Sequence, residues 1–226
     1  IHLLIMISLY VMLAQSLNIV MGYGGMLSLC HAAFYGLGAY MATLLMMQAQ
    51  WPFLPSLLAA FIGVGLIAWL VSFFATRLHG DFFVLATLGF QMITFTVLYN
   101  WVAVTQGPFG LPGIPSPSFL GISITTPIAF LLLTLVALGI CCSMTWWLTS
   151  SPYGRVLQAV REDETAARSL GKNAASYKRS AFAWAVAIAA VPGALFATYS
   201  SYIDPTSFTV HESILIICVL VIGGTG

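Results

Sequence analysis

The sequence lacks the residue arrangements of common catalytic sites. It contains no Gly-x-Ser-x-Gly, no His-Glu-x-x-His and no phosphate-binding P-loop. Its apolar stretches offer mostly Ser and Thr, with Gln91 and Asn18. The 4 cysteines lie in apolar runs without a Cys-x-x-Cys spacing, so we expect them to pack between helices. We therefore expect no catalytic residue, no metal site and no cofactor.

A glycine-rich segment, Gly22-Tyr-Gly-Gly-Met-Leu-Ser-Leu-Cys-His31, is the first candidate for a functional site. Three glycines within four residues would break a membrane helix, and irregular backbone at that depth persists only where protein or a water-filled cavity covers it. Broken helices of this kind line substrate paths in transporters. The alternative is close helix packing by small residues, with the histidine as a packed, hydrogen-bonded side chain. The predicted translocation residues are Gly22, Gly24, Gly25, Ser28 and His31.

A second glycine cluster closes the chain at residues 223–226. Two apolar segments interrupted by glycine in corresponding places indicate an internally repeated transporter fold.

Residues 151–171 form the strongest candidate segment, and their pattern predicts one short exposed helix. Ser151 is expected to cap this helix, and Pro152 suits its first position. Gly171 is a natural C-terminal stop.

The predicted helix carries a small apolar face with a charged rim. Ala166, Ala167 and Leu170 form the face, and Glu164 and Arg168 are a favourable i,i+4 pair. This shape suits docking into a groove on a soluble partner. The alternative is a plain solvated loop that obeys the positive-inside rule.

The composition defines the class of protein that must position these segments. Of 226 residues only 6% are charged, 60% are hydrophobic, and the mean hydropathy is +1.00. A soluble domain has about 25% charged residues. The composition excludes a soluble enzyme, a disordered chain and a nucleic-acid-binding protein, and indicates an integral membrane protein.

Long uncharged runs predict the spans, because a spanning helix needs about 20 apolar residues and charges avoid the bilayer centre. The fold class is therefore all-α: a polytopic transmembrane helical bundle with glycine-broken helices and about six to seven spans. We expect one domain over residues 1–226, with a cytoplasmic segment at 150–179. The predicted spans are residues 3–20, 32–49, 55–76, 82–103, 126–149 and 180–203, with a seventh that begins near 212.

The positive residues predict the orientation. Segment 155–179 carries six Lys and Arg residues and should face the cytoplasm. Counting spans from there puts Arg77 on the same side, and puts Ile1 and the proline-rich loop 104–125 outside. Asp204 and Glu212 then flank an external turn. Because the chain starts and stops within apolar runs, we expect it to be part of a longer protein that has further helices.

The sequence resembles the LivM-type permease subunits of bacterial high-affinity branched-chain amino acid ABC importers. The matching stretches occur in family order and cover nearly the whole chain. One departure is Cys30, where the family pattern has glycine. The matching stretches are Gly22–Tyr40, Arg77–Leu88, Thr105–Pro115, Arg161–Gly171 and Gly223–Gly226.

The resemblance implies a machine of several subunits in the bacterial inner membrane. It implies a homologous second permease, two ABC ATPase subunits docked inside, and a solute-binding protein that delivers a branched-chain or related amino acid from outside. The chain itself would be no enzyme, since ATP would be hydrolysed in the partners. The residues implied to contact the ATPase, as the family's coupling helix, are Glu162, Asp163, Ala166, Ala167, Leu170 and Gly171.

Three alternatives remain open at this point. Permeases of urea or amide importers share much of the pattern. A self-contained secondary carrier or channel is disfavoured because acidic residues within the predicted spans are absent. A structural or assembly subunit would have no solute path.

Overall fold

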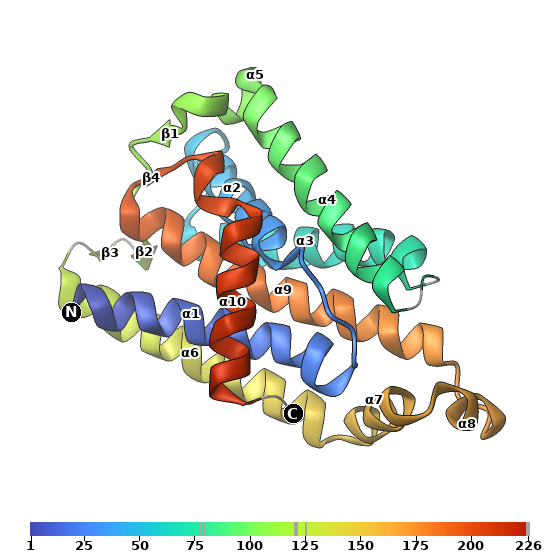
Figure 1. Ribbon diagram of the computed structural model, residues 1–226. Coiled ribbons are helices and arrows are strands. Elements are labelled where there is room, and N and C mark those ends of the chain that lie inside the picture. The colour runs from blue at the N-terminus through green and yellow to red at the C-terminus, as the bar shows by residue number, and fades with distance from the viewer. Residues whose placement is uncertain (77, 79, 120–121, 125, 225–226) are drawn as a thin grey trace.

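The computed structural model describes residues 1–76, 78, 80–119, 122–124 and 126–224, and these residues form a helical bundle (Figure 1). The long helices are α1 (His2–Asn18), α2 (His31–Met47), α3 (Phe53–Ala75), α4 (Asp81–Asn100), α6 (Pro127–Ser150), α9 (Ala174–Ser200) and α10 (Val210–Gly223). The short helices are α5 (Val102–Thr105), α7 (Pro152–Glu162) and α8 (Glu164–Ser169). Single turns occur at Ile19–Tyr23 (π-helical), Gly107–Phe109 and Pro205–Phe208 (both 3₁₀).

Five helices within the described part of the chain are long and apolar enough to cross a membrane: α1 with its π-helical turn, α3, α4, α6 and α9. Helices α2 and α10 are shorter, with 17 and 14 residues. The protein is thus a polytopic helical membrane protein, as the composition predicts. Most predicted spans lie close to the observed bounds. Helix α9 includes six residues before the predicted span, and the Asn173 side chain caps it by accepting a hydrogen bond from Ser176 N (3.2 Å).

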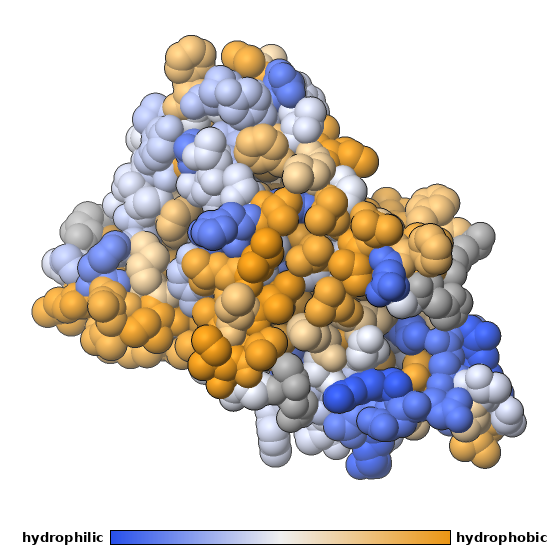
Figure 2. All heavy atoms as spheres, in the orientation of Figure 1, coloured by the Kyte–Doolittle hydropathy of each residue, from blue (hydrophilic) through white to orange (hydrophobic). Residues whose placement is uncertain are grey.

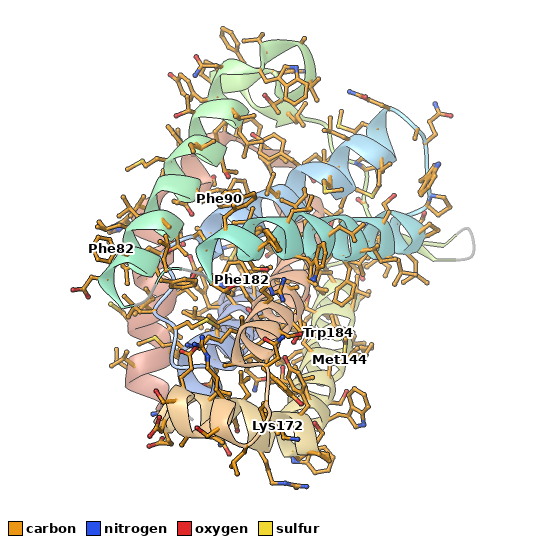
Figure 3. The ribbon with its side chains drawn as sticks, turned by 90° about the vertical axis from the view of Figure 1, so that its right-hand side faces the viewer. Phe82, Phe90, Met144, Lys172, Phe182 and Trp184 are labelled. Atoms are coloured by element: carbon orange, nitrogen blue, oxygen red, sulfur yellow. The ribbon has the colours of Figure 1, made fainter. Side chains whose placement is uncertain are left out.

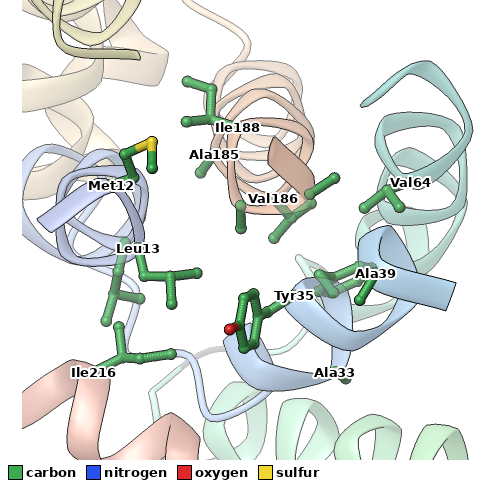
Figure 4. Close-up of a cluster of buried hydrophobic side chains, with 14 of the residues drawn as sticks. Met12, Leu13, Ala33, Tyr35, Ala39, Val64, Ala185, Val186, Ile188 and Ile216 are labelled. Carbon is green, nitrogen blue, oxygen red and sulfur yellow. The ribbon is translucent and has the colours of Figure 1, made fainter. Parts of the chain in front are cut away.

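Helix α9 lies at the centre of the bundle, between α1 on one side and α2 and α3 on the other (Figure 4). Its buried face is rich in alanine, which lets neighbouring backbones approach closely. At the contact with α2, a Cβ on Gly38 would lie 2.5 Å from Ala190 Cα, so no larger residue fits there.

The connections gather at two ends of the bundle, as the predicted orientation requires. At one end, strand β1 (Leu111–Pro112) pairs antiparallel with β4 (Tyr202–Ile203), which ties the proline-rich loop to the end of α9. A second pair, β2 (Ser118–Phe119) with β3 (Ile122–Ser123), lies in the same loop. The N-terminus is at this end, where His2 Nδ1 lies 2.8 Å from Tyr199 Oη.

Helices α7 and α8 form the opposite end, which is strongly hydrophilic, whereas apolar side chains cover most of the bundle seen in the same view (Figure 2). Lys172 lies at this end and the apolar residues Met144 and Trp184 lie on the flank of the bundle (Figure 3). Exposed apolar side chains such as Leu66 on α3 and Val136 on α6, 60% and 61% exposed, suit contact with lipid.

Candidate functional site

The segment predicted to be cytoplasmic consists of two helices, so the prediction of one helix over 151–171 is wrong. The chain breaks at Asp163, whose backbone is extended (φ −149°, ψ 102°). The Asp163 carboxylate accepts hydrogen bonds from Thr165 N (2.8 Å) and Ala166 N (3.0 Å), which caps α8. Aspartate is among the preferred N-cap residues, and this capping interaction starts a new helix where the helical pattern alone suggested continuation.

Ser151 occupies the predicted N-cap position of α7, with Pro152 at the first helical position, but its hydroxyl donates backward to Leu148 O (2.7 Å) and makes no cap bond. Tyr153 instead fixes α7 in place. Its hydroxyl donates to Tyr177 O (3.0 Å) and lies 2.6 Å from Ser180 Oγ, both on α9. Burial raises the pKa of the Tyr153 hydroxyl above its ordinary value of 10.0, so the group remains a hydrogen-bond donor at neutral pH.

The predicted apolar face of α8 is correct for two of its three residues. Leu170 is 80% exposed and Ala166 is exposed. Ala167 is buried and packs with Val160 of α7 and Ala174 of α9, so it holds α8 against the bundle and is not available to a partner. The surface that remains for docking consists of Glu162, Asp163, Ala166, Leu170 and Gly171, all exposed.

Two other predicted features of α8 are confirmed. Glu164 pairs with Arg168 at 2.6 Å, and its second oxygen lies 2.6 Å from Lys178 Nζ on α9. Gly171 ends the helix with φ +77°, a conformation that favours glycine, and its N–H donates to Arg168 O (2.9 Å). Helix α8 is therefore a stable, positioned element.

The predicted glycine break after α1 is confirmed. Helix α1 widens into the π-helical turn, in which Gly24 N donates to Ile19 O (3.1 Å). The chain then leaves the helix at Gly25, whose φ of +64° is rarely adopted by residues with a side chain. A short irregular stretch leads to the start of α2 at His31.

The structure brings the glycine break together with helices α7 and α8, which the sequence did not predict. The Arg161 guanidinium, in the last turn of α7, donates a hydrogen bond to Gly22 O. The aliphatic part of the same side chain covers Gly25, where an added Cβ would lie 2.8 Å from Arg161 Cγ. We call this contact of Arg161 with Gly22 and Gly25 the α1–α7 joint.

The other predicted path residues are packed inside the protein. Gly24 lies close to the backbone, since a Cβ there would meet Val20 O at 2.7 Å. Ser28 and His31 are fully buried: Ser28 Oγ lies 3.2 Å from Cys30 Sγ, and His31 Nε2 lies 2.7 Å from Ser16 Oγ. This geometry favours the alternative role of His31 as a packed, hydrogen-bonded residue. A role of the whole segment in the translocation path stays a prediction.

Polar side chains of two other helices accept hydrogen bonds from backbone N–H groups at the start of α2. No role was predicted for these residues. Gln91 of α4 accepts a hydrogen bond from Ala33 N (2.7 Å) and donates to Phe208 O (2.7 Å). Ser213 of α10 accepts from Ala32 N (3.0 Å), and Thr87 of α4 accepts from Leu29 N (3.1 Å). The sequence feature that could have indicated this role is a glutamine inside a predicted span, because such a polar group must find hydrogen-bond partners in the bundle.

Two predictions fall partly on residues outside those described. Helix α10 ends at Gly223 and Gly224 has φ +96°, which fits a second glycine break, but Thr225 and Gly226 lie outside the described residues. Arg77, predicted to face the cytoplasm, also lies outside them.

The fold and the α1–α7 joint define a polytopic membrane protein with a glycine-broken helix held by the helix pair α7 and α8. The chain belongs to the family described as branched-chain amino acid transport system / permease component, which matches residues 1–226.

Three relatives are permease proteins of transport or import systems. The chain is 32% identical to the high-affinity branched-chain amino acid transport system permease protein LivM of Escherichia coli, over 96% of this chain and 57% of that protein. It is 32% identical to LivM of Salmonella typhimurium, over 98% of this chain and 57% of that protein. It is also 28% identical to the autoinducer 2 import system permease protein LsrC of Photorhabdus laumondii, over 92% of this chain and 60% of that protein. The chain thus spans less than two thirds of the length of these relatives. No solved structure matches it significantly.

Proposed function

We propose that this chain is the membrane-spanning permease subunit of an ATP-driven ABC importer that carries branched-chain or related amino acids across the bacterial inner membrane. The family match over the whole chain and the similarity to the LivM permease proteins support this function. ATP hydrolysis then takes place in partner subunits, and this chain supplies part of the solute path.

The surface of α8 is the proposed docking site for an ABC ATPase subunit. Glu162, Asp163, Ala166, Leu170 and Gly171 are all exposed there, around an apolar side chain. A leucine at 80% exposure, with a charged rim, resembles the anchor of a helix that binds in a groove. Ala167 contributes from below by fixing α8 to α7 and α9.

The α1–α7 joint is the observation that carries the proposal. A docking surface is useful to an importer only if its displacement reaches the membrane helices. Arg161 follows Val160, which packs with α8, and binds the backbone of the glycine break. A displacement of α7 and α8 by the ATPase would therefore pull on the end of α1. There the π-helical turn has i→i+5 backbone hydrogen bonds in place of the α-helical pattern, and glycine allows the chain to bend.

The remaining partners follow from the same proposal. A homologous second permease would complete the solute path between the two subunits. A solute-binding protein would dock at the opposite end, where β1 pairs with β4. The glycine-rich segment would move during transport, since it lies at the joint.

The test is a double substitution on the docking surface, Glu162→Lys with Ala166→Arg, in cells that carry the complete importer. We expect loss of uptake and loss of ATPase co-purification with the permease at normal membrane abundance. Ser116→Lys with Phe109→Arg is the matched control. Both residues are exposed at the opposite end, so ATPase co-purification should be unchanged. Undiminished uptake and co-purification in the first variant would contradict the coupling role.

Two further experiments separate the alternatives. Transport by the purified chain alone in liposomes under an ion gradient would identify a self-contained carrier. The names of LivM and LsrC give different solutes. Uptake of labelled leucine in the presence of unlabelled branched-chain amino acids, urea or autoinducer 2 would therefore identify the solute class.

A further inference from the structure

Glu212 lines a cavity within the bundle, although the sequence placed it at the edge of an external turn. It lies in the first turn of α10 and is only partly exposed. Its carboxylate accepts a hydrogen bond from the Tyr10 hydroxyl of α1 (3.0 Å), across 202 positions of sequence. Residues from α1, α2, α9, α10 and the Pro205–Phe208 turn line a partly open cavity of about 210 Å³ beside this pair.

The rest of the cavity wall is mainly apolar and aromatic. Tyr35 of α2 and Phe196 of α9 lie with ring centroids 5.7 Å apart, and Leu9 and Leu13 of α1 complete the opposite wall. In Figure 4 the Tyr35 ring projects from α2 toward Leu13 and Ile216. Pockets for drug-sized ligands measure about 300–1,000 Å³, so this smaller cavity suits a small solute.

The carboxylate has no cationic partner among the described residues. The ion pairs found there are those of Glu164 with Arg168 and Lys178, at the other end of the molecule. A partly exposed carboxylate among apolar residues is stabilised by a nearby positive charge, and its bond to the Tyr10 hydroxyl supplies none. Aromatic faces add attraction for a cation. The chemistry of the cavity therefore selects a small, positively charged group.

The cavity is closed on the side of α7. Further along α1 from Leu13, Ser16 and Leu17 are fully buried, and Ser16 Oγ lies 2.7 Å from His31 Nε2. The cavity thus lies in the half of α1 that is remote from the α1–α7 joint. A solute held there would be separated from the cytoplasmic end by packed side chains.

We propose that Glu212 and Tyr10 form a binding site for the ammonium group of the transported solute, with the aromatic and leucine side chains of the cavity around its apolar part. This inference rests on the proposed function, because an amino acid carries both an ammonium group and, in the branched-chain case, an apolar side chain. A solute without a positive charge would leave the carboxylate uncompensated.

The experiment is uptake of labelled L-leucine by the complete importer in proteoliposomes, with Glu212→Gln and Tyr10→Phe variants. Glu212→Gln keeps the shape and removes the charge, so the half-saturating leucine concentration should rise by about 10- to 100-fold, the loss typical of a charge-assisted bond. Tyr10→Phe should raise it less. In the wild-type permease with its ATPase subunits but without the solute-binding protein, 3-methylbutylamine should compete with labelled leucine for binding and 4-methylpentanoate should not.

A matched control separates a binding effect from damage to α10. His211→Gln introduces the same residue at the adjacent, exposed position and should leave the half-saturating concentration unchanged. Unchanged leucine affinity in Glu212→Gln, or competition by the carboxylate analogue as strong as by the amine, would overturn the site. If Glu212→Gln fails to fold, the competition arm alone decides. Absence of leucine uptake by the wild-type importer would instead refute the proposed function.

Discussion

The α1–α7 joint predicts that Arg161→Ala uncouples the importer without unfolding it. The substitution removes the guanidinium that binds Gly22 O and the aliphatic chain that covers Gly25. Arg161 is exposed, so Gly22 O can recruit water once the side chain is gone. The fold should therefore tolerate the loss, while the mechanical link between α7 and α1 is broken.

The size of the effect follows from the bond that is lost. A hydrogen bond from a charged donor contributes about 1.5–3 kcal/mol, and partial exposure lowers this to about 1–2 kcal/mol. A ligand or partner can shift a conformational equilibrium only by the free energy with which it distinguishes the two states. Loss of about 1–2 kcal/mol corresponds to a factor of about 5–30. Solute transported per ATP hydrolysed should fall by that factor.

The assay is leucine uptake and ATP hydrolysis measured together in proteoliposomes that hold the complete importer. Arg155→Ala is the matched control, because Arg155 lies on the same helix, is exposed, and its side chain makes no hydrogen bond or ion pair with the described residues. Arg161→Lys keeps the charge and should have an intermediate effect. A wild-type ratio of transport to hydrolysis in Arg161→Ala would refute the mechanical role of the joint.

Three further predictions test the surrounding structure. Gly25 and Gly113 both have positive φ, so Gly25→Ala and Gly113→Ala should each lower the free energy of unfolding by about 1–2 kcal/mol, measured by thermal melts. Only Gly25→Ala should also impair uptake, since an added Cβ at Gly113 would have no neighbour within 4 Å. Gln91→Leu leaves Phe208 O without its hydrogen-bond donor and removes the acceptor of Ala33 N at the start of α2, so the melting temperature should fall sharply. Gln15→Leu is the control: the Gln15 side chain makes no hydrogen bond with the described residues, so the melting temperature should be nearly unchanged. Leu170→Asp should reduce ATPase binding in a pull-down without lowering the melting temperature, because Leu170 is 80% exposed.

The sequence predicted those features that depend on local pattern or on composition. Uncharged runs predicted the spans, because lipid excludes charge wherever it occurs in the chain. The glycine cluster predicted the break after α1, since its cause is local. The break at Asp163 could have been predicted from aspartate's preference for N-cap positions, but the pattern of residues 151–171 was interpreted as a single helix.

Features that depend on contacts between distant segments were not predicted. Gln91 bonds to the start of α2 and to Phe208 O, over separations of 58 and 117 residues, which no local pattern encodes. Ala167 looked like a partner-binding residue because helical periodicity gives the face of a helix but not what covers that face. Glu212 was placed near an external turn by counting spans, and only the packing of α10 against α1 reveals its cavity.

Helix α1 connects the two proposed sites and gives the coupling a physical route. Tyr10 contributes to the cavity near the middle of α1, and Gly22 O accepts the Arg161 bond in the π-helical turn that follows α1, 12 residues or about 18 Å further along. The intervening Ser16 and Leu17 are fully buried, so this part of α1 moves with the residues packed around it. A pull at the joint would thus alter the distance between Tyr10 and Glu212, and a solute held there would resist that change. Because such coupling is reciprocal, leucine should shift the equilibrium affinity of the ATPase subunits for ATP in the wild-type importer, and Arg161→Ala should reduce this shift.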